Sequence, residues 1–360
     1  MTSPSPPLDF RARRRDPPAL AALDLGTNNC RLLVARPEGD GFRVVDSFSR
    51  IVRLGEGVAS SGHLSERAIA RTVAALRVCA RIIGRHDVGR LRCVATEACR
   101  RARNGVEFLE RVRRVTGLAF EILPHEDEAR LALLGCLPLV DPAAEHVLLV
   151  DIGGGSTEVL WLDRSQGGGR AVLRCTSSVP IGVVTLAEAF ALEPDAAVFE
   201  EMVRRVQRLL VPIEASHHIR LGMAGARGQM VGTSGTVTTL AALHLELTRY
   251  DRRQIDGQVL DAGAIAAVSA RLRGMTNAER VAHPCIGTGR ADLVVAGCAI
   301  LEAILRSWPV DQLRVADRGL REGMLQAMLG RSLDVALGDP GATVAVVSPA
   351  LAAGALRRSS

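Results

Sequence analysis

Two stretches of the chain share one pattern of apolar and polar positions. In LAALDLGTNNCRLLVA (20–35), an apolar run ends at an acid, a short polar turn follows, and apolar residues resume. The same order recurs in VLLVDIGGGSTEVLWL (147–162). An apolar run, a turn rich in Gly, Asn, Ser and Thr, and a second apolar run predict a β-hairpin. Because the hairpin occurs twice, we expect two related halves that face each other.

Both turns have the composition of an anion-binding loop. Glycine lets backbone N–H groups approach a phosphate closely, and successive N–H groups in a turn form a nest for an anion. A carboxylate beside a phosphate would repel it, so Asp24 and Asp151 at the strand ends imply a bridging cation, for which Mg²⁺ is the common solution. The alternative is that each turn only closes a hairpin. The turn residues are Gly26, Thr27, Asn28 and Asn29 in the first loop and Gly153, Gly154, Gly155, Ser156 and Thr157 in the second.

Two further segments place polar residues at the start of a helix. FEILPHEDEARLALLGCL (120–137) predicts a short strand that ends at Pro124 and then a helix with three acids in its first turn. MVGTSGTVTTLAAL (230–243) predicts a strand, a turn and a helix, so Gly232, Ser234 and Gly235 form a candidate anion site at a helix N-terminus. The alternative for this turn is a helix cap made by Ser234 or Thr236.

Composition excludes several classes of protein. The 360 residues include no lysine, so all 45 basic residues are arginines, and neither a P-loop nor Schiff-base chemistry is available. Guanidinium groups bind phosphate oxygens two at a time, and the net charge of +6 suits a polyanionic partner, although solubility explains it equally well. The chain has no G-x-S-x-G elbow, which disfavours a serine hydrolase. With seven Phe, two Trp and one Tyr it has no stacking platform, so we expect no specific nucleic-acid binding.

The sequence also bears on location. No uncharged apolar segment is long enough to predict a membrane span. Residues 1–17 are rich in Pro, Ser and Arg, which predicts a disordered basic arm rather than a secretory signal. The eight cysteines form no C-x-x-C pair and mostly lie in apolar runs, which is typical of a reducing compartment. We therefore expect a cytoplasmic protein.

Seven motifs, taken in order, resemble the exopolyphosphatase and guanosine pentaphosphate phosphatase family within the superfold of actin, hexokinase and the heat-shock ATPases. This resemblance covers the chain from about Leu20 to Gly330 and implies an α/β fold of two ribonuclease-H-like domains, each a mixed five-stranded sheet flanked by helices, with a cleft between them. The motifs are DLGTNNCRL (24–32), ATEACRRARNG (95–105), EDEARLALLG (126–135), VDIGGGSTEV (150–159), VGTSGTVTTLA (231–241), GRADLVVAG (289–297) and GLREGML (319–325).

The resemblance also implies roles for particular acids. In the family's E-A-R motif, the glutamate that is taken to activate the attacking water matches Glu128. Glu128, Asp151 and Glu158 are thus the implied catalytic residues. Asp151, Glu158 and the symmetry-related Asp24 are the implied metal ligands, and the implied cofactor is Mg²⁺.

Two arginines match family positions that face the phosphate chain. Arg100 lies at the start of a predicted helix, and Arg53 lies in an R-L-G pattern on a predicted strand. A surface ion pair of little energetic value is the alternative for both. The GLREGML segment is expected to be architectural.

The resulting hypothesis is Mg²⁺-dependent hydrolysis of the terminal phosphate of inorganic polyphosphate, with guanosine pentaphosphate as the alternative substrate. An ATP-dependent small-molecule kinase of the same superfold and a non-catalytic polyphosphate- or alarmone-binding protein stay open. The family also allows a homodimer. The expected organisation is an arm (1–17), a first domain (18–140), a second domain (141–311), a helix that returns to the first domain (312–330) and a disordered tail (331–360).

Overall fold

The computed structural model describes residues 17–165, 171–190, 193–225, 227–333 and 335–337. The first half contains a five-stranded sheet in the order β3-β2-β1-β4-β5. The β1–β2 and β2–β3 pairs are antiparallel, and the β1–β4 and β4–β5 pairs are parallel. The strands are β1 (Ala19–Leu25), β2 (Asn29–Glu38), β3 (Gly41–Ile51), β4 (Val88–Ala95) and β5 (Glu121–Ile122).

The second half repeats this topology. Its sheet has the order β10-β11-β9-β6-β7-β8-β12, and the central run β8-β7-β6-β9-β11 has the same strand directions as the first sheet. The predicted pair of mixed five-stranded sheets is thus confirmed, with one strand more at each edge of the second. The strands are β6 (His146–Ile152), β7 (Thr157–Asp163), β8 (Ala171–Val179), β9 (Gly228–Thr233), β10 (Val259–Asp261), β11 (Gln312–Ala316) and β12 (Val335–Leu337).

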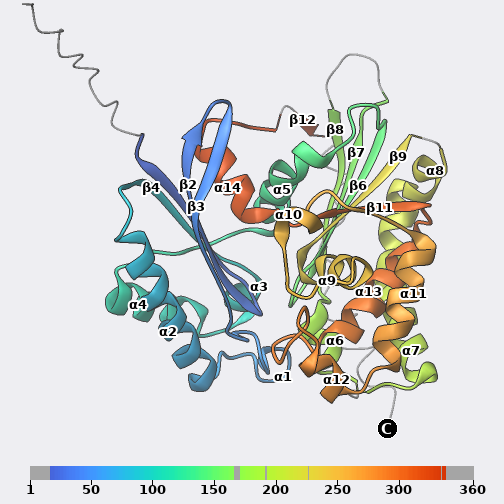
Figure 1. The fold of residues 1–360 in the computed structure, drawn as a ribbon, viewed down its shortest axis with the longest axis horizontal. Helices are drawn as coiled ribbons and strands as arrows, with labels where there is room; N and C mark the ends of the chain where they lie inside the picture. The colour runs from blue at the N-terminus through green and yellow to red at the C-terminus, as the bar shows by residue number, and fades with distance from the viewer. Residues whose placement is uncertain (1–16, 166–170, 191–192, 226, 334, 338–360) are drawn as a thin grey trace, which may run out of the picture.

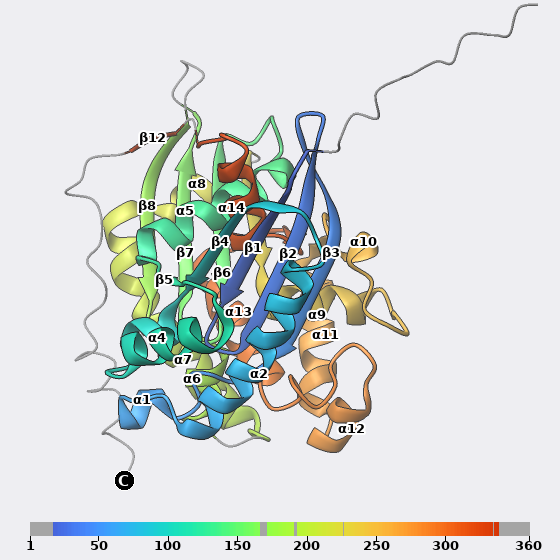
Figure 2. The ribbon, with the colours of Figure 1, turned by 90° about the vertical axis from the view of Figure 1, so that its left-hand side faces the viewer.

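Helices and sheets alternate in five layers (Figure 1). Figure 2 views the molecule from the side of the first sheet and its outer helices. On that side lie α1 (Val58–Ser61), α2 (Glu66–Ile83), α3 (Glu97–Arg101) and α4 (Gly105–Thr116). With the second sheet lie α6 (Val183–Ala187), α7 (Ala196–His217), α8 (Ile219–Met223), α9 (Ser234–His244), α10 (Arg252–Ile255), α11 (Ala262–Gly274), α12 (Asn277–Ala282) and α13 (Val294–Ser307). Between the sheets lie α5 (His125–Cys136), a short 3₁₀ turn (Leu137–Leu139) and α14 (Leu320–Met328).

Each middle helix covers the inner face of a different sheet. α5 places Ala129, Leu133 and Cys136 against the second sheet, whereas α14 places Met324 and Leu325 against β1 and β2 of the first. Among the described helices, none combines the length and apolar content that a bilayer crossing requires.

Two expectations need correction at the C-terminal end. The returning helix begins at Leu320, because 312–316 form β11 of the second sheet instead. Part of the tail is ordered, because β12 pairs in parallel with β8 through its backbone, which local composition does not reveal. The rest of the tail beyond Leu337 lies outside the described residues, as do residues 1–16 of the predicted arm.

The two middle helices cross at glycines. A Cβ on Gly135 of α5 would lie 2.0 Å from the carbonyl oxygen of Gly319, and a Cβ on Gly323 of α14 would lie 1.8 Å from the carbonyl oxygen of Leu131. Real Cβ atoms do not approach backbone oxygens so closely, so the helices must separate if either glycine gains a side chain. This backbone-to-backbone contact joins the second half of α5 to the first turn of α14.

We expect Gly323→Ala to lower the free energy of unfolding by about 2–3 kcal/mol, because the added methyl group overpacks a contact that has no flexible neighbour. Urea denaturation would measure the change. Gly274→Ala is the matched control, since no heavy atom lies within 4 Å of a Cβ at that helical position. Equal stabilities for Gly323→Ala and the wild type would contradict the proposed role of this crossing.

Candidate active site

The two phosphate loops have the same geometry. The N–H of Gly26 donates to the carbonyl of Asn29 over 2.9 Å, and the N–H of Gly153 donates to that of Ser156 over 3.0 Å. Their flanking strands pair in the same register, so Asp24 lies opposite Arg31 where Asp151 lies opposite Glu158. The repeat is therefore structural, and it differs in charge: the first hairpin carries an arginine where the second carries a glutamate.

Neighbouring segments fix the shape of the loops. In the first loop, the carbonyl of Asn28 accepts from the N–H groups of Val52 (2.8 Å) and Arg53 (3.0 Å). In the second, the carbonyls of Gly153 and Gly154 accept from the start of α6 over 3.0 and 2.8 Å. These bonds hold the loop backbones without using the N–H groups that an anion would need.

Several loop N–H groups are available to a ligand. Among the described residues, the N–H groups of Thr27, Asn28, Gly154 and Gly155 donate to no acceptor. The loops also touch each other, because a Cβ on Gly155 would lie 2.8 Å from Oγ1 of Thr27. The two nests thus face one small volume, which suits a single phosphate group.

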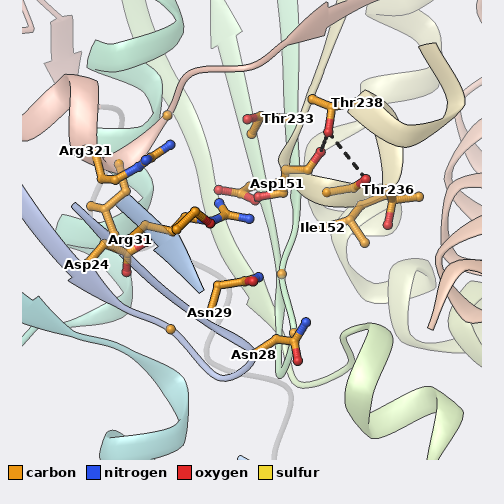
Figure 3. Close-up of a pocket in the computed structure, with 18 of the residues that line it drawn as sticks. Asp24, Asn28, Asn29, Arg31, Asp151, Ile152, Thr233, Thr236, Thr238 and Arg321 are labelled. Carbon is orange, nitrogen blue, oxygen red and sulfur yellow. Dashed lines mark hydrogen bonds between the residues drawn. The ribbon is translucent and has the colours of Figure 1, made fainter. Parts of the chain in front are cut away.

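A cavity of about 410 Å³ lies between the halves and takes residues from both loops. Asp24, Arg31 and Arg321 lie on one side of it, Asp151, Thr233, Thr236 and Thr238 lie on the other, and Asn28 and Asn29 lie below them (Figure 3). The cavity lining includes these predicted site residues: Asp24, Gly26, Thr27, Asn28, Asn29, Glu128, Asp151, Gly153, Gly154, Gly155, Ser156, Glu158, Ser234 and Gly235.

Glu128 is held by a buried network at the start of α5. Its Oε2 accepts from Arg100 Nη2 over 3.1 Å, and the same nitrogen lies 3.0 Å from Glu97 Oε2 and 2.8 Å from His125 Nδ1. Arg100 can only donate, so Nδ1 of His125 accepts and its proton is assigned to Nε2, 3.5 Å from Glu97. Burial, and next the charge of Arg100, lowers the pKa of His125, which keeps the ring neutral.

Four carboxyl groups of the cavity lining, those of Asp24, Glu128, Asp151 and Glu158, have raised pKa values. Burial, and next the charge of Asp151, raises the pKa of Glu158 from 4.5 to about 7. Burial raises the pKa of Asp24 from 3.8 to about 6, with Arg31 opposing the shift, and it raises that of Asp151 despite a bond from Ser234. Burial, and next the charge of Glu158, raises the pKa of Glu128 well above its ordinary value. Groups of this kind can accept a proton near neutral pH or bind a cation.

The donor set fits a metal ion. One ligand atom from each of His125, Glu128 and Glu158 lies within 4.8 Å of the others. Asp24 and Asp151 line the same cavity, and carboxylate oxygens are the ligands that hard divalent cations prefer. His125 was not predicted as a site residue, although its position three residues before Glu128 places both on one face of α5.

The turn after β9 differs from a simple helix cap. Ser234 has a φ of 74° and its hydroxyl donates to Oδ1 of Asp151 over 2.5 Å, while the N-cap residue, Thr233, makes no side-chain cap bond. Ser234 thus positions the aspartate at the end of β6, and the alternative of a cap by Ser234 or Thr236 is not observed.

Two cavity arginines also escaped the sequence analysis. The guanidinium groups of Arg31 and Arg321 lie in the cavity and, among the described residues, have no carboxylate within ion-pairing distance. The hairpin pattern could have revealed Arg31, because a hairpin closed at residues 26–29 pairs Asp24 with Arg31 on the next strand. Arg321 belongs to GLREGML, which was expected to be only architectural, whereas its neighbour Glu322 does cap α14 through Gly319.

Four predicted phosphate-binding residues lie elsewhere. Arg100, which is inside α3 rather than at its start, bonds Glu97, His125 and Glu128 and does not line the cavity. Arg53 pairs with Asp292 of the other half over 2.8 Å. Both guanidinium groups were predicted to bind phosphate. In the structure their charged partners are carboxylates, including ones from distant segments of the chain.

The other two of the four are buried. The hydroxyl of Thr157 donates to the carbonyl of Ile181 over 2.7 Å, so it serves the hairpin. Gly232 lies within β9, where a Cβ would be 3.0 Å from Val237, so its small size serves packing. Neither residue lines the cavity.

Comparisons with known proteins agree on one family. The model of the Ppx/GppA phosphatase family matches residues 33–332. Exopolyphosphatase 2 of Mycobacterium tuberculosis is 33% identical over 328 residues, which is 86% of this chain and 98% of that protein. The crystal structure of the Aquifex aeolicus family member is 32% identical, has a TM-score of 0.70, and matches over 86% of this chain and 97% of its own.

A further crystal structure, of an exopolyphosphatase-like protein, is 30% identical with a TM-score of 0.79, over 86% of this chain and 97% of its own. The family model runs through both halves, from within β2 to beyond the end of α14. The predicted class of phosphoanhydride hydrolase is thereby confirmed. The chain belongs to the Ppx/GppA phosphatase family.

Proposed function

We propose that the protein is an exopolyphosphatase, which hydrolyses the terminal phosphate of inorganic polyphosphate with the help of Mg²⁺. The observation that carries the proposal is the placement of Glu128 in the same cavity as two loops with free N–H groups. The names of the relatives support this substrate, since the M. tuberculosis relative is an exopolyphosphatase.

The proposed reaction needs three groups from the protein. The N–H groups of the two loops and the guanidinium of Arg31 bind the terminal phosphate and offset its negative charge. Glu128 takes a proton from water as the water oxygen bonds to the terminal phosphorus. The bond from that phosphorus to the bridging oxygen breaks, and the shortened chain leaves with the bridging oxygen as its new end.

Arg100 and Glu97 position the base in this scheme. The guanidinium of Arg100 joins both carboxylates, so Glu128 is held in one orientation at the cavity wall. Removal of the guanidinium would leave the Glu128 carboxylate free to turn, and burial would raise its pKa further because Arg100 now opposes that rise.

Asp151, Glu158 and Asp24 are the proposed holders of Mg²⁺, with His125 and Glu128 close to the same place. A bound Mg²⁺ would neutralise phosphate oxygens and orient the chain end. The hydroxyl groups of Ser156 and Ser178 donate to Oε1 of Glu158 over 2.6 and 3.0 Å, which aims its carboxylate at the loop.

Guanosine pentaphosphate is the second candidate substrate, and one observation favours it. The cavity continues past Asp151 to Tyr250 and Asp317, where the aromatic ring lies beside a carboxylate and the Thr238 hydroxyl. An aromatic face with a hydrogen-bond acceptor beside it suits a purine base.

The decisive experiment is phosphate release from inorganic polyphosphate, guanosine pentaphosphate and ATP by the wild type and by Glu128→Gln. We expect Glu128→Gln to lower kcat for polyphosphate by about 10²–10⁴-fold, since an amide cannot accept the water proton. Its far-ultraviolet circular dichroism and its melting temperature should stay close to those of the wild type. The matched control is Glu126→Gln, an acid of the same helical turn that does not line the cavity.

Each result has a clear meaning. A variant with wild-type turnover would remove Glu128 from the mechanism. Phosphate release from guanosine pentaphosphate alone would identify that compound, and not polyphosphate, as the substrate. Tight binding of polyphosphate without any release would instead indicate a binding protein.

The raised pKa values generate a second prediction. Glu158 and Asp24 have higher pKa values in the folded chain than in the unfolded chain, so the metal-free folded state binds more protons between about pH 4 and 7. The free energy of unfolding in EDTA should therefore fall as the pH rises through that window, by about 3 kcal/mol for each of the two groups.

Mg²⁺ competes with those protons, so it should stabilise the protein more at about pH 8 than at about pH 5.5. Urea denaturation at both pH values, with EDTA or Mg²⁺, measures the effect. Glu158→Gln should flatten the pH dependence. A stabilisation by Mg²⁺ that is the same at both pH values would argue against binding at these carboxylates.

A further inference from the structure

A second cavity, of about 770 Å³, adjoins the first between β3, α2 and the segment 285–290. The two cavities share Asn29, Ser49, Tyr250 and Arg290, so they are continuous at the first phosphate loop. We call the second cavity the arginine groove, because its lining contains Arg50, Arg53, Arg67, Arg71 and Arg290 but only one carboxylate, that of Glu56.

Two of these arginines build the groove. Arg71 donates to the carbonyls of Val52 (3.0 Å) and Arg53 (3.2 Å) and pairs with Glu56 over 2.7 Å, which uses the only carboxylate of the lining. Arg53 has a φ of 48° and its side chain pairs with Asp292 of the other half. Because the N–H groups of Val52 and Arg53 hold Asn28, the groove wall and the first phosphate loop share one backbone support.

Arg290 stands where the groove meets the first cavity. Its guanidinium donates to Oγ1 of Thr239 over 3.1 Å and lies 5.8 Å from the centre of the Tyr250 ring. The adjacent Gly289 packs against Ile51 at the end of β3, since a Cβ there would lie 2.0 Å from Cδ1 of Ile51. Groove and cavity are therefore joined by a contact between the two halves.

The remaining two arginines are Arg50 and Arg67, and the guanidinium of Arg50 lies 5.2 Å from the centre of the Phe48 ring. Arg67 lies one helical turn before Arg71 on the same face of α2, and Arg50 lies near the end of β3. Both are exposed, and among the described residues neither guanidinium has a hydrogen-bond acceptor or a carboxylate within ion-pairing distance. One such arginine would be an ordinary surface residue, but here they line a concavity that opens from a phosphate site.

We propose that the arginine groove binds the phosphate groups that follow the cleaved one, so that the site extends along an inorganic polyphosphate chain. The inference rests on the proposed function. A chain with its end at the two loops passes Asn29 and enters the groove, where successive guanidinium groups meet successive phosphates. Guanosine pentaphosphate would not use the groove in this way, because a nucleoside follows its third 5′-phosphate.

The test compares Arg50→Gln/Arg67→Gln with a matched control, Arg113→Gln/Arg114→Gln. The control pair lies exposed on α4, lines neither cavity, and has no acceptor among the described residues. Both variants lose the same charge without breaking a hydrogen bond or ion pair between described residues, and Arg50→Gln also removes the contact with the Phe48 ring. KM and kcat are measured with long-chain inorganic polyphosphate and with inorganic triphosphate.

We expect the ratio of KM for the long chain to KM for triphosphate to rise about 5- to 20-fold in the groove variant, because two exposed charge contacts are lost. The kcat for the long chain should change little, since the terminal phosphate still meets the loops. The rise of log KM for the long chain with log salt concentration should also become shallower, as fewer counterions are released. The control pair should leave the ratio and the slope at wild-type values.

Other outcomes would overturn the inference. An equal rise in KM for triphosphate would place the two arginines at the terminal phosphate, and an equal effect in the control pair would reduce the groove to general surface charge. An unchanged ratio would mean that the chain leaves by another route.

Binding to Glu128→Gln separates this inference from the proposed function. If the wild type releases no phosphate, long-chain polyphosphate can still be titrated against Glu128→Gln with and without the groove substitutions. If polyphosphate binds more weakly only when the groove substitutions are present, the groove is a binding site even though the proposed hydrolysis is wrong. Equal binding would reject the groove as well.

Discussion

Four carboxylates that line one buried cavity cannot all stay ionised at neutral pH without positive charge nearby. Burial raises the pKa of each of Asp24, Glu128, Asp151 and Glu158, and mutual repulsion adds to the shift of Glu158. Arginines next to the cavity offset part of this energy, and a divalent cation would offset more. The hairpins and the middle helices position these four acids, and the nearby arginines offset their negative charge.

The internal duplication explains how the acids came to face each other, and also why the two halves are not equivalent. Both hairpins present an aspartate at the end of the central strand and free N–H groups in the turn. Across from that aspartate, one hairpin carries Arg31 and the other Glu158. The first hairpin therefore adds a positive charge beside the two N–H nests and the second adds a negative charge, a combination that suits a metal-bound phosphate.

The proposed reaction also requires a fixed distance between the base, Glu128, and the two phosphate loops. Glu128 stands on α5, which packs on the second sheet, whereas Arg321 stands on α14, which packs on the first. The crossing at Gly135 and Gly323 brings the backbones of these helices into direct contact. Because neither helix has a side chain to compress at the crossing, the second half of α5 and the first turn of α14 are held at one separation, and the helix that carries Glu128 is fixed relative to the turn that carries Arg321.

The sequence alone determined the local features: the two hairpins, the composition of their loops, the helix that begins before Glu128, and, through motif order, the α/β architecture. These follow from alternation, turn residues and spacing, which act over a few residues. The tertiary structure decided which side chains reach the cavity. Arg100 and Arg53 turn to carboxylates brought from elsewhere in the chain, Thr157 and Gly232 serve packing, and His125, Arg31 and Arg321 enter the site. The edge strand β12 and the arginine groove likewise depend on pairing and on the meeting of the two halves. The physical reason is that ion pairs and cavities form between residues far apart in the chain, so their partners are set by packing and not by local pattern.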